Sequence, residues 1–421
     1  MKDTNKKIGR WQGAGLLATT LLGTGVFILP QMTLAIASNG ALFSWLLLTV
    51  AIIPVTVVFA LLAAKYPHAG GPAYFVEQAF GAIAGRSIGL IFLLIVPLGV
   101  PAAILMTVKF ANALMPFVGY QQLVAELALV AVLFLLNYRG IHLSAKVQFL
   151  LTLAIITVVV LLLLAFTIDN NAAQQSTAAP LEITKIMAAA GIAFWSFLGV
   201  EAMTHLANDF KNPKKDMVPA MLIGTGLVGL IYLGCTWLLI HVPTDSPLAM
   251  VGVFDQLLSE HGALVIGILG IAGGLSSANV YTASTIRLIA SFSQQGVLPH
   301  YFSATNRHNI PLRALVLVLT IMLLVLVITF ASDKNLEHLI AWCNGVFVII
   351  YSISMAAALK LLPSRQRPFI YLGFIFCLAL AWGLAIKMLY ALSLLAIVIP
   401  ILCWQKRLQC KKKSTLAKAV L

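Results

Sequence analysis

The chain has 421 residues, of which 61% are hydrophobic and only 10% are charged, which excludes a soluble domain. Apolar runs of about 20 residues recur from end to end, as in membrane proteins with many helical spans. The formal net charge of +14 would suit nucleic acid. However, no basic patch is interleaved with aromatic residues on a soluble domain, so we expect membrane lipid and no nucleic acid beside these charges.

The hydropathy pattern predicts an all-α membrane protein with about twelve transmembrane helices. The expected spans are residues 12–37, 42–64, 88–114, 122–138, 147–168, 186–208, 219–241, 262–290, 314–331, 337–359, 369–386 and 388–405. If the N-terminus lies inside, all Lys and Arg residues except Lys109, Lys185, Lys334 and Lys387 fall on the inner side. This asymmetry predicts that both termini are cytoplasmic. No cleavage pattern follows the basic start, so we expect no removable signal peptide.

The first span contains Gly23-Thr24-Gly25-Val26-Phe27, followed by Pro30. Two glycines and a nearby proline loosen a helix in lipid, where no solvent can replace the lost backbone hydrogen bonds. Freed N–H groups around Thr24 and Gly25 could therefore bind an anionic group of a transported molecule. The alternative is that the glycines only let another helix pack closely.

Three further features concern the first half of the chain and the cysteines. Pro97 and Pro101 lie about one turn apart in the third span and predict a kink that faces other helices. The polar stretch 169–185 is the best candidate for a joint between two halves. The five cysteines lie singly, without paired spacing, so they indicate apolar packing and neither disulfides nor a metal site.

The sixth span contains Gly191 and then the run from Phe194 to Glu201. A carboxyl group inside an apolar span is costly unless it is neutral, paired or exposed to water, so Glu201 is a functional candidate. The alternative is a structural carboxyl that hydrogen-bonds to a neighbouring helix.

Spans 1 and 6 each begin a set of five, and an odd number of crossings gives the two sets opposite orientations. Paired interrupted helices at corresponding positions point to a transport site between inverted repeats. The predicted organisation is a first repeat in residues 1–168, a connecting loop in 169–185, a second repeat in 186–360, two further helices in 361–405 and a basic cytoplasmic tail in 406–421.

The later spans add polar side chains to this core. Span 8 has a stripe that could line a cavity and includes Ser277, Asn279 and Tyr281. Span 10 carries a weaker polar spot at Trp342 and Asn344. Spans 11 and 12 are apolar throughout, which indicates helices that face lipid or form a homodimer.

Several motifs, in this order along the chain, resemble the amino acid–polyamine–organocation (APC) transporter superfamily. They are Gly23 to Phe27 with Pro30, Ala69-Gly70-Gly71-Pro72, Phe197-Leu198-Gly199-Val200-Glu201, Lys211-Asn212-Pro213-Lys214-Lys215, and Arg287 ahead of Gly296-Val297-Leu298-Pro299. Within the superfamily the chain is similar to bacterial exporters of L-methionine and branched-chain amino acids, on the cues Tyr66-Pro67, Pro97-x-Gly99-x-Pro101 and Ala202-Met203-Thr204-His205. This implies a bacterial inner-membrane protein with a LeuT-like core of five plus five helices and two additional helices.

The resemblance also implies roles for individual residues. The substrate carboxylate would meet the backbone at Thr24 and Gly25, near Gly23, and the ammonium group would meet carbonyls near Leu21, Trp195 and Leu198. Trp195 occupies the place of a gating aromatic residue in the family, Tyr281 that of a tryptophan in exchangers of basic amino acids, and Glu201 that of an acid linked to proton-dependent gating. Some proton-coupled importers carry a lysine within helix 5, whereas Lys146 lies at the start of this span. Glu201 is therefore the better proton candidate.

The expected pocket wall is aromatic and neutral. It comprises Phe194, Trp195, Phe197, Leu198, Ser277, Asn279, Tyr281 and Trp342. An unpaired charge in a dry pocket is heavily penalised, so this wall favours small neutral amino acids such as methionine, leucine, isoleucine and valine. The prediction is export by alternating access, with proton antiport through Glu201.

Other functions remain open at this level. An importer or exchanger of the same fold could carry cationic amino acids or polyamines. A channel would need a continuous polar pore, and no span has a ring-forming selectivity sequence. An intramembrane enzyme would need a nucleophile and base or metal ligands within the spans; only His205, one turn after Glu201, suggests such a pair, and no cofactor is expected.

Overall fold

The computed structural model describes residues 8–23, 25–68, 70–140, 145–168, 180–332 and 336–419. These residues form helices, as the apolar runs predict. The helices are α1 (Arg10–Leu22), η1 (Gly25–Phe27), α2 (Leu29–Ala37), α3 (Gly40–Lys65), α4 (Gly71–Phe80), α5 (Ala82–Leu114), α6 (Tyr120–Tyr138), α7 (Ala145–Ile168), α8 (Ile183–Ala193), η2 (Phe194–Phe197), η3 (Ala202–Asp209), α9 (Pro213–His241), α10 (Ala249–Leu257), α11 (Gly262–Gln294), η4 (His300–Ser303), α12 (Leu312–Ala331), α13 (Leu336–Leu361), η5 (Ser364–Gln366), α14 (Arg367–Leu384), η6 (Ala385–Lys387) and α15 (Met388–Ala419).

Ten helical stretches among the described residues are long and apolar enough to cross a membrane, or eleven with the bent pair α1 and α2. The predicted multi-span membrane protein is therefore confirmed, but the count of twelve is not. The difference lies near the C-terminus, where α14, η6 and α15 belong to one apolar stretch, Ser364–Gln405, of 42 residues. The sequence predicts two spans there.

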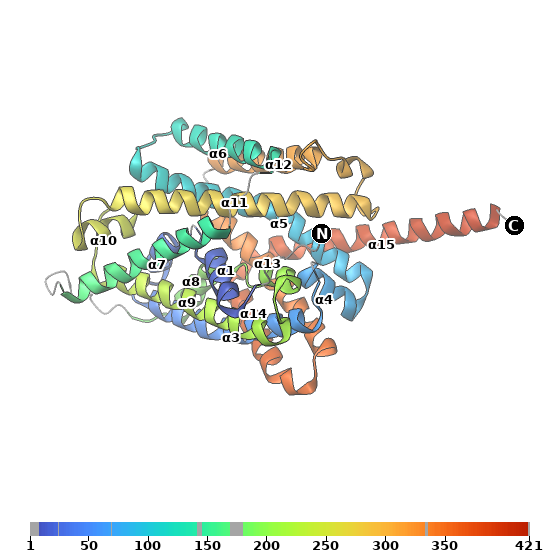
Figure 1. Ribbon diagram of the computed structural model, residues 1–421, viewed down its shortest axis with the longest axis horizontal. Helices are drawn as coiled ribbons and strands as arrows, with labels where there is room; N and C mark the ends of the chain where they lie inside the picture. The colour runs from blue at the N-terminus through green and yellow to red at the C-terminus, as the bar shows by residue number, and fades with distance from the viewer. Residues whose placement is uncertain are drawn as a thin grey trace.

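Helices that lie far apart in the sequence pack in pairs. α5 packs against α11, α3 against α9 and α6 against α12, and Figure 1 shows the long α11 beside α5. Small residues allow the close approach: a Cβ atom added to Gly270 of α11 would collide with the ring of Phe110 on α5. The α8–η3 stretch and α13 are largely buried within the bundle, whereas less than a third of the apolar windows of α6 and α7 is buried.

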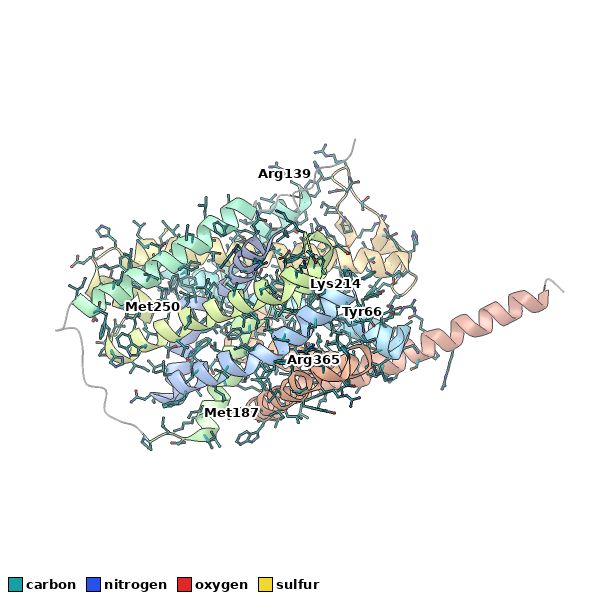
Figure 2. All side chains as sticks on the ribbon, turned by 60° about the horizontal axis from the view of Figure 1, so that its bottom comes forward. Tyr66, Arg139, Met187, Lys214, Met250 and Arg365 are labelled. Carbon is teal, nitrogen blue, oxygen red and sulfur yellow. The ribbon has the colours of Figure 1, made fainter. Side chains whose placement is uncertain are left out.

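The labelled residues in Figure 2 show which segments lie at each end of the bundle. Lys214 and Tyr66 lie toward the end from which α15 projects, and Met250 and Met187 lie toward the opposite end (Figure 2). α15 extends well beyond the packed body to the C-terminus (Figure 1). The α5 helix is assigned as helical throughout, including Pro97 and Pro101.

Candidate functional site

The first long helix breaks where the glycines predict it. α1 ends at Leu22, Gly23 has a φ of +29°, and a single 3-10 turn follows from Gly25 to Phe27. The segment after the break is bent by 56° from α1. A positive φ is accessible to glycine at little cost, so Gly23 permits the bend. Thr24 lies outside the described residues.

The second break lies between α8 and α9. α8 gives way to η2, and then Gly199 has a φ of +125° before η3 begins. A Cβ atom added to Gly199 would lie 2.8 Å from Thr20 Cγ2 and 3.1 Å from Leu21 Cδ2. The two helix breaks are therefore in direct contact, which only a residue without a side chain permits.

α11 closes one side of the first break. A Cβ atom added to Gly23 would lie 3.0 Å from Ser277 Oγ, and one added to Gly273 would lie 3.1 Å from the Gly23 carbonyl oxygen. Gly273 and Ser277, which belongs to the predicted polar stripe, thus pack directly on the backbone at the first break.

A cavity of about 70 Å³ lies beside the two breaks. Two kinds of wall enclose it. The broken segments and α11 contribute Thr20, Leu21, Gly23, Gly25, Trp195, Leu198, Ser277, Ala278 and Tyr281, and the facing helices α5 and α13 contribute Ile95, Val96, Gly99, Val100, Ala103, Cys343 and Phe347. Among the described residues that line the cavity, none has a charged side chain.

Most of the sequence-predicted binding residues lie together in this cavity. They are Leu21, Gly23, Gly25, Trp195, Leu198, Ser277 and Tyr281. Because they come from three separate parts of the chain, their convergence depends on both helix breaks and on the packing of α11.

Five of the less central candidates do not line the cavity. Phe194 and Phe197 are buried in the core, and Phe194 packs edge-on against Tyr351. Asn279 accepts a 2.8 Å hydrogen bond from Asn137 Nδ2.

The other two lie on α13. Asn344 donates to the Gly191 carbonyl at 2.7 Å and to the Ile192 carbonyl at 3.3 Å. The ring of Trp342 stacks on that of Tyr390, with centroids 5.5 Å apart. All five residues thus hold helices together.

Glu201 is buried and lies outside the cavity lining, immediately after the second break. Its Oε2 accepts a 2.5 Å hydrogen bond from the Tyr351 hydroxyl and a 3.0 Å bond from the Gly199 N–H. Among the residues that the structure describes, its Oε1 has no hydrogen-bond partner. The carboxyl group therefore joins the broken segment between η2 and η3 to α13.

Sequence reasoning missed one wall of the cavity. In the sequence, Gly99 stands out only as part of a proline-flanked kink and of a family motif, and Cys343 only as a packing residue. Apolar residues that line a cavity cannot be told from core residues by type alone. Tyr351 was missed for the same reason, since a tyrosine in an apolar span gives no sign of its partner.

A buried hydroxyl also lies at the first break. Tyr232 on α9 stacks on Trp45 with centroids 4.3 Å apart, and its hydroxyl has no hydrogen-bond partner within the described part of the chain. A Cβ atom added to Gly25 would lie 2.7 Å from this hydroxyl. Among the described residues, no group of three or more His, Cys, Asp or Glu side chains could hold a metal ion.

Residues 8–416 match the family described as Amino acid permease. The chain is 34% identical to the L-methionine/branched-chain amino acid exporter YjeH of Escherichia coli (strain K12) over 401 residues, which cover 94% of this chain and 96% of that protein. It is 27% identical to the uncharacterized amino acid permease YecA of Bacillus subtilis (strain 168), over 87% and 88% of the two chains. It is 22% identical to the cadaverine/lysine antiporter of Escherichia coli (strain K12), over 90% of each chain.

Proposed function

Because this chain belongs to the amino acid permease family, it is a membrane transporter and not an enzyme, and we propose that it exports neutral apolar L-amino acids across the bacterial inner membrane. The membership agrees with the resemblance drawn from the motifs. The substrates proposed are methionine, leucine, isoleucine and valine. The similarity to an exporter of methionine and branched-chain amino acids supports this choice.

The observation that carries the proposal is the composition of the cavity walls. The wall built from the broken segments brings the backbone on either side of the breaks at Gly23 and Gly199 to the cavity. The N–H ends of interrupted helices attract a carboxylate, and the C=O ends attract an ammonium group. In this arrangement the carboxylate lies at Thr24 and Gly25, and the ammonium group lies near the carbonyls of Leu21, Trp195 and Leu198.

The opposite wall determines which side chains fit. Its residues on α5 and α13 are apolar apart from the Cys343 thiol. A charged substrate side chain would lose its hydration there and gain no opposing charge from the lining residues, which is heavily unfavourable. A neutral apolar side chain has no such penalty.

A cationic amino acid or polyamine is the second candidate, because the similarity to a cadaverine/lysine antiporter spans 90% of both chains. Such a substrate needs a carboxylate in the pocket. Glu201 is the nearest candidate, but it lies outside the lining and is already hydrogen-bonded to Tyr351 and Gly199. The neutral substrate therefore fits better.

The proposed architecture is a pair of inverted five-helix repeats, in residues 1–168 and 186–360, joined by the loop 169–185. In these repeats, corresponding spans pack against each other. The second spans are α3 and α9, the third are α5 and α11, and the fourth are α6 and α12. A two-fold axis between the repeats would produce such pairing. Residues 361–405 would add two spans, because the 42 residues of the apolar stretch Ser364–Gln405 exceed the length of one crossing.

Transport would proceed by alternating access, with the broken helices and their neighbours α3 and α9 rocking against the rest. Proton antiport through Glu201 would drive export, and its Oε1, which has no hydrogen-bond partner among the described residues, would take up the proton. Both termini would be cytoplasmic and the tail 406–421 would face anionic lipid. Lys214 lies at the bundle end from which α15 projects (Figure 2), which agrees with this orientation.

Apolar side chains exposed on α14 and α15 would face lipid or a second copy of the chain.

The test is uptake by inverted membrane vesicles from cells that overproduce the protein. We expect uptake of labelled methionine and leucine above that of vesicles without the protein, little uptake of arginine, and stimulation by a proton gradient acidic inside the vesicle. Arginine uptake faster than leucine uptake would contradict the neutral-substrate proposal. Methionine uptake at the same rate with and without the pH gradient would contradict the proton coupling but not the choice of substrate.

A further inference from the structure

Gly99 on α5 differs from other glycines that lie between packed helices. A Cβ atom added to Gly89 or Gly270 would collide with a phenylalanine ring, so a neighbour already occupies the space at those positions. At Gly99 the nearest atoms to an added Cβ are Cys343 Sγ at 3.6 Å and Trp195 Cη2 at 3.8 Å. Both are ordinary van der Waals distances. Helix packing therefore leaves room for a methyl group at Gly99.

The free space at Gly99 is part of the cavity. Gly99, Trp195, Cys343 and Phe347 all line it. Glycine in the interior of a helix is less favourable than alanine. Since no neighbour excludes an alanine here, the missing side chain needs another reason, and the cavity volume supplies one.

We propose that Gly99 sets the size of the side chain that the cavity admits, and that the space between Gly99, Trp195, Cys343 and Phe347 holds the end of an apolar amino acid side chain. This inference rests on the proposed function, because it takes the broken segments as the place of the amino and carboxyl groups. The subsite has aromatic rings and a thiol and no charged group. It therefore suits branched aliphatic side chains and the thioether of methionine, which packs well against aromatic rings.

The test is the substrate preference of purified protein in proteoliposomes. Initial uptake rates of alanine, valine, leucine and methionine are compared for the wild type, Gly99→Ala, Gly99→Val and the control Gly226→Ala. Gly226 is also helical, and an added Cβ there meets no atom within 4 Å. The control thus repeats the change in helix propensity away from the cavity.

We expect Gly99→Ala to lower kcat/KM for leucine and methionine about tenfold relative to alanine, because a methyl group fills the place of the substrate's outermost carbon. Gly99→Val is expected to enlarge this change, and Gly226→Ala to leave the order of substrates as in the wild type. In Gly99→Ala, the second change Cys343→Ala removes the sulfur that faces the new methyl. The double variant should therefore have a ratio of kcat/KM for leucine to that for alanine at least about threefold higher than Gly99→Ala has.

Two outcomes overturn the inference while the proposed function stands. One is a wild-type ratio of leucine to alanine in both Gly99 variants, and the other is an equal loss for all four substrates. If the wild type transports none of the four amino acids, the proposed function fails and this inference fails with it. Thermal unfolding of each variant shows whether an equal loss comes from misfolding. If the Gly99 variants misfold, the single variant Cys343→Ala decides the question instead. The inference then requires that Cys343→Ala raise the rate for leucine and methionine relative to alanine.

Discussion

Replacing Gly199 with alanine is expected to force the two helix breaks apart. The φ of +125° is strained for any residue with a side chain and costs about 1–3 kcal/mol. The added Cβ would also lie 2.8 Å from Thr20 Cγ2, and such overpacking costs about 1–3 kcal/mol more. The described conformation should therefore lose at least about 2 kcal/mol, and we expect affinity for leucine to fall about 30-fold or more.

Binding of labelled leucine to the purified protein measures this effect directly, with Gly226→Ala as the control for a glycine change elsewhere. Thr20→Ser removes the methyl group that the new Cβ would meet and keeps the hydroxyl that bonds to the Leu16 carbonyl. In a double-mutant cycle it should recover the overpacking part of the loss and not the backbone part. If Gly199→Ala binds leucine within about twofold of the wild type, the contact between the breaks does not matter for the site.

Three other substitutions test separate parts of the account. Asn344→Leu removes the donor to the carbonyls that end α8, at about 1–3 kcal/mol, and should lower the Tm; an unchanged Tm would contradict that anchoring role. Tyr232→Phe removes a buried hydroxyl without a partner, so the Tm should stay equal or rise, and a clear fall would show that the hydroxyl is bonded. Glu201→Gln should abolish the response of export to a pH gradient while leucine counterflow continues, and full pH-dependent export would refute the proton role.

The sequence predicts the helices and the first break well, for physical reasons. Spans are fixed by hydropathy over about 20 residues, and most expected spans begin and end within a few residues of observed helices, although α15 continues to Ala419, well beyond the expected end at residue 405. The break at Gly23 is local, because the glycines and Pro30 act on the backbone next to them. The one difference in the span count arises at Ala385, where the φ is +46° in a stretch that remains helical on both sides.

The cavity wall was harder to predict, because it depends on contacts between distant segments. Trp195 and Tyr281 lie in the cavity as expected, but Phe194 and Asn279, one or two residues away, point into the core or toward another helix. In a helical segment neighbouring residues face different directions, and the sequence does not say which direction is the cavity. Cys343 illustrates the reverse case, since an apolar wall residue and a core residue have the same chemistry.

The most direct test of the central claim is a crystal or cryo-electron microscopy structure of the protein with a bound amino acid. Free selenomethionine supplied to protein with ordinary methionines gives an anomalous signal in crystals. The account predicts the carboxyl group at the Gly25 backbone and the amino group near the Leu21 and Leu198 carbonyls. It places the selenium between Gly99, Trp195 and Cys343. A selenium signal elsewhere in the protein, or an empty cavity at saturating ligand, would contradict it.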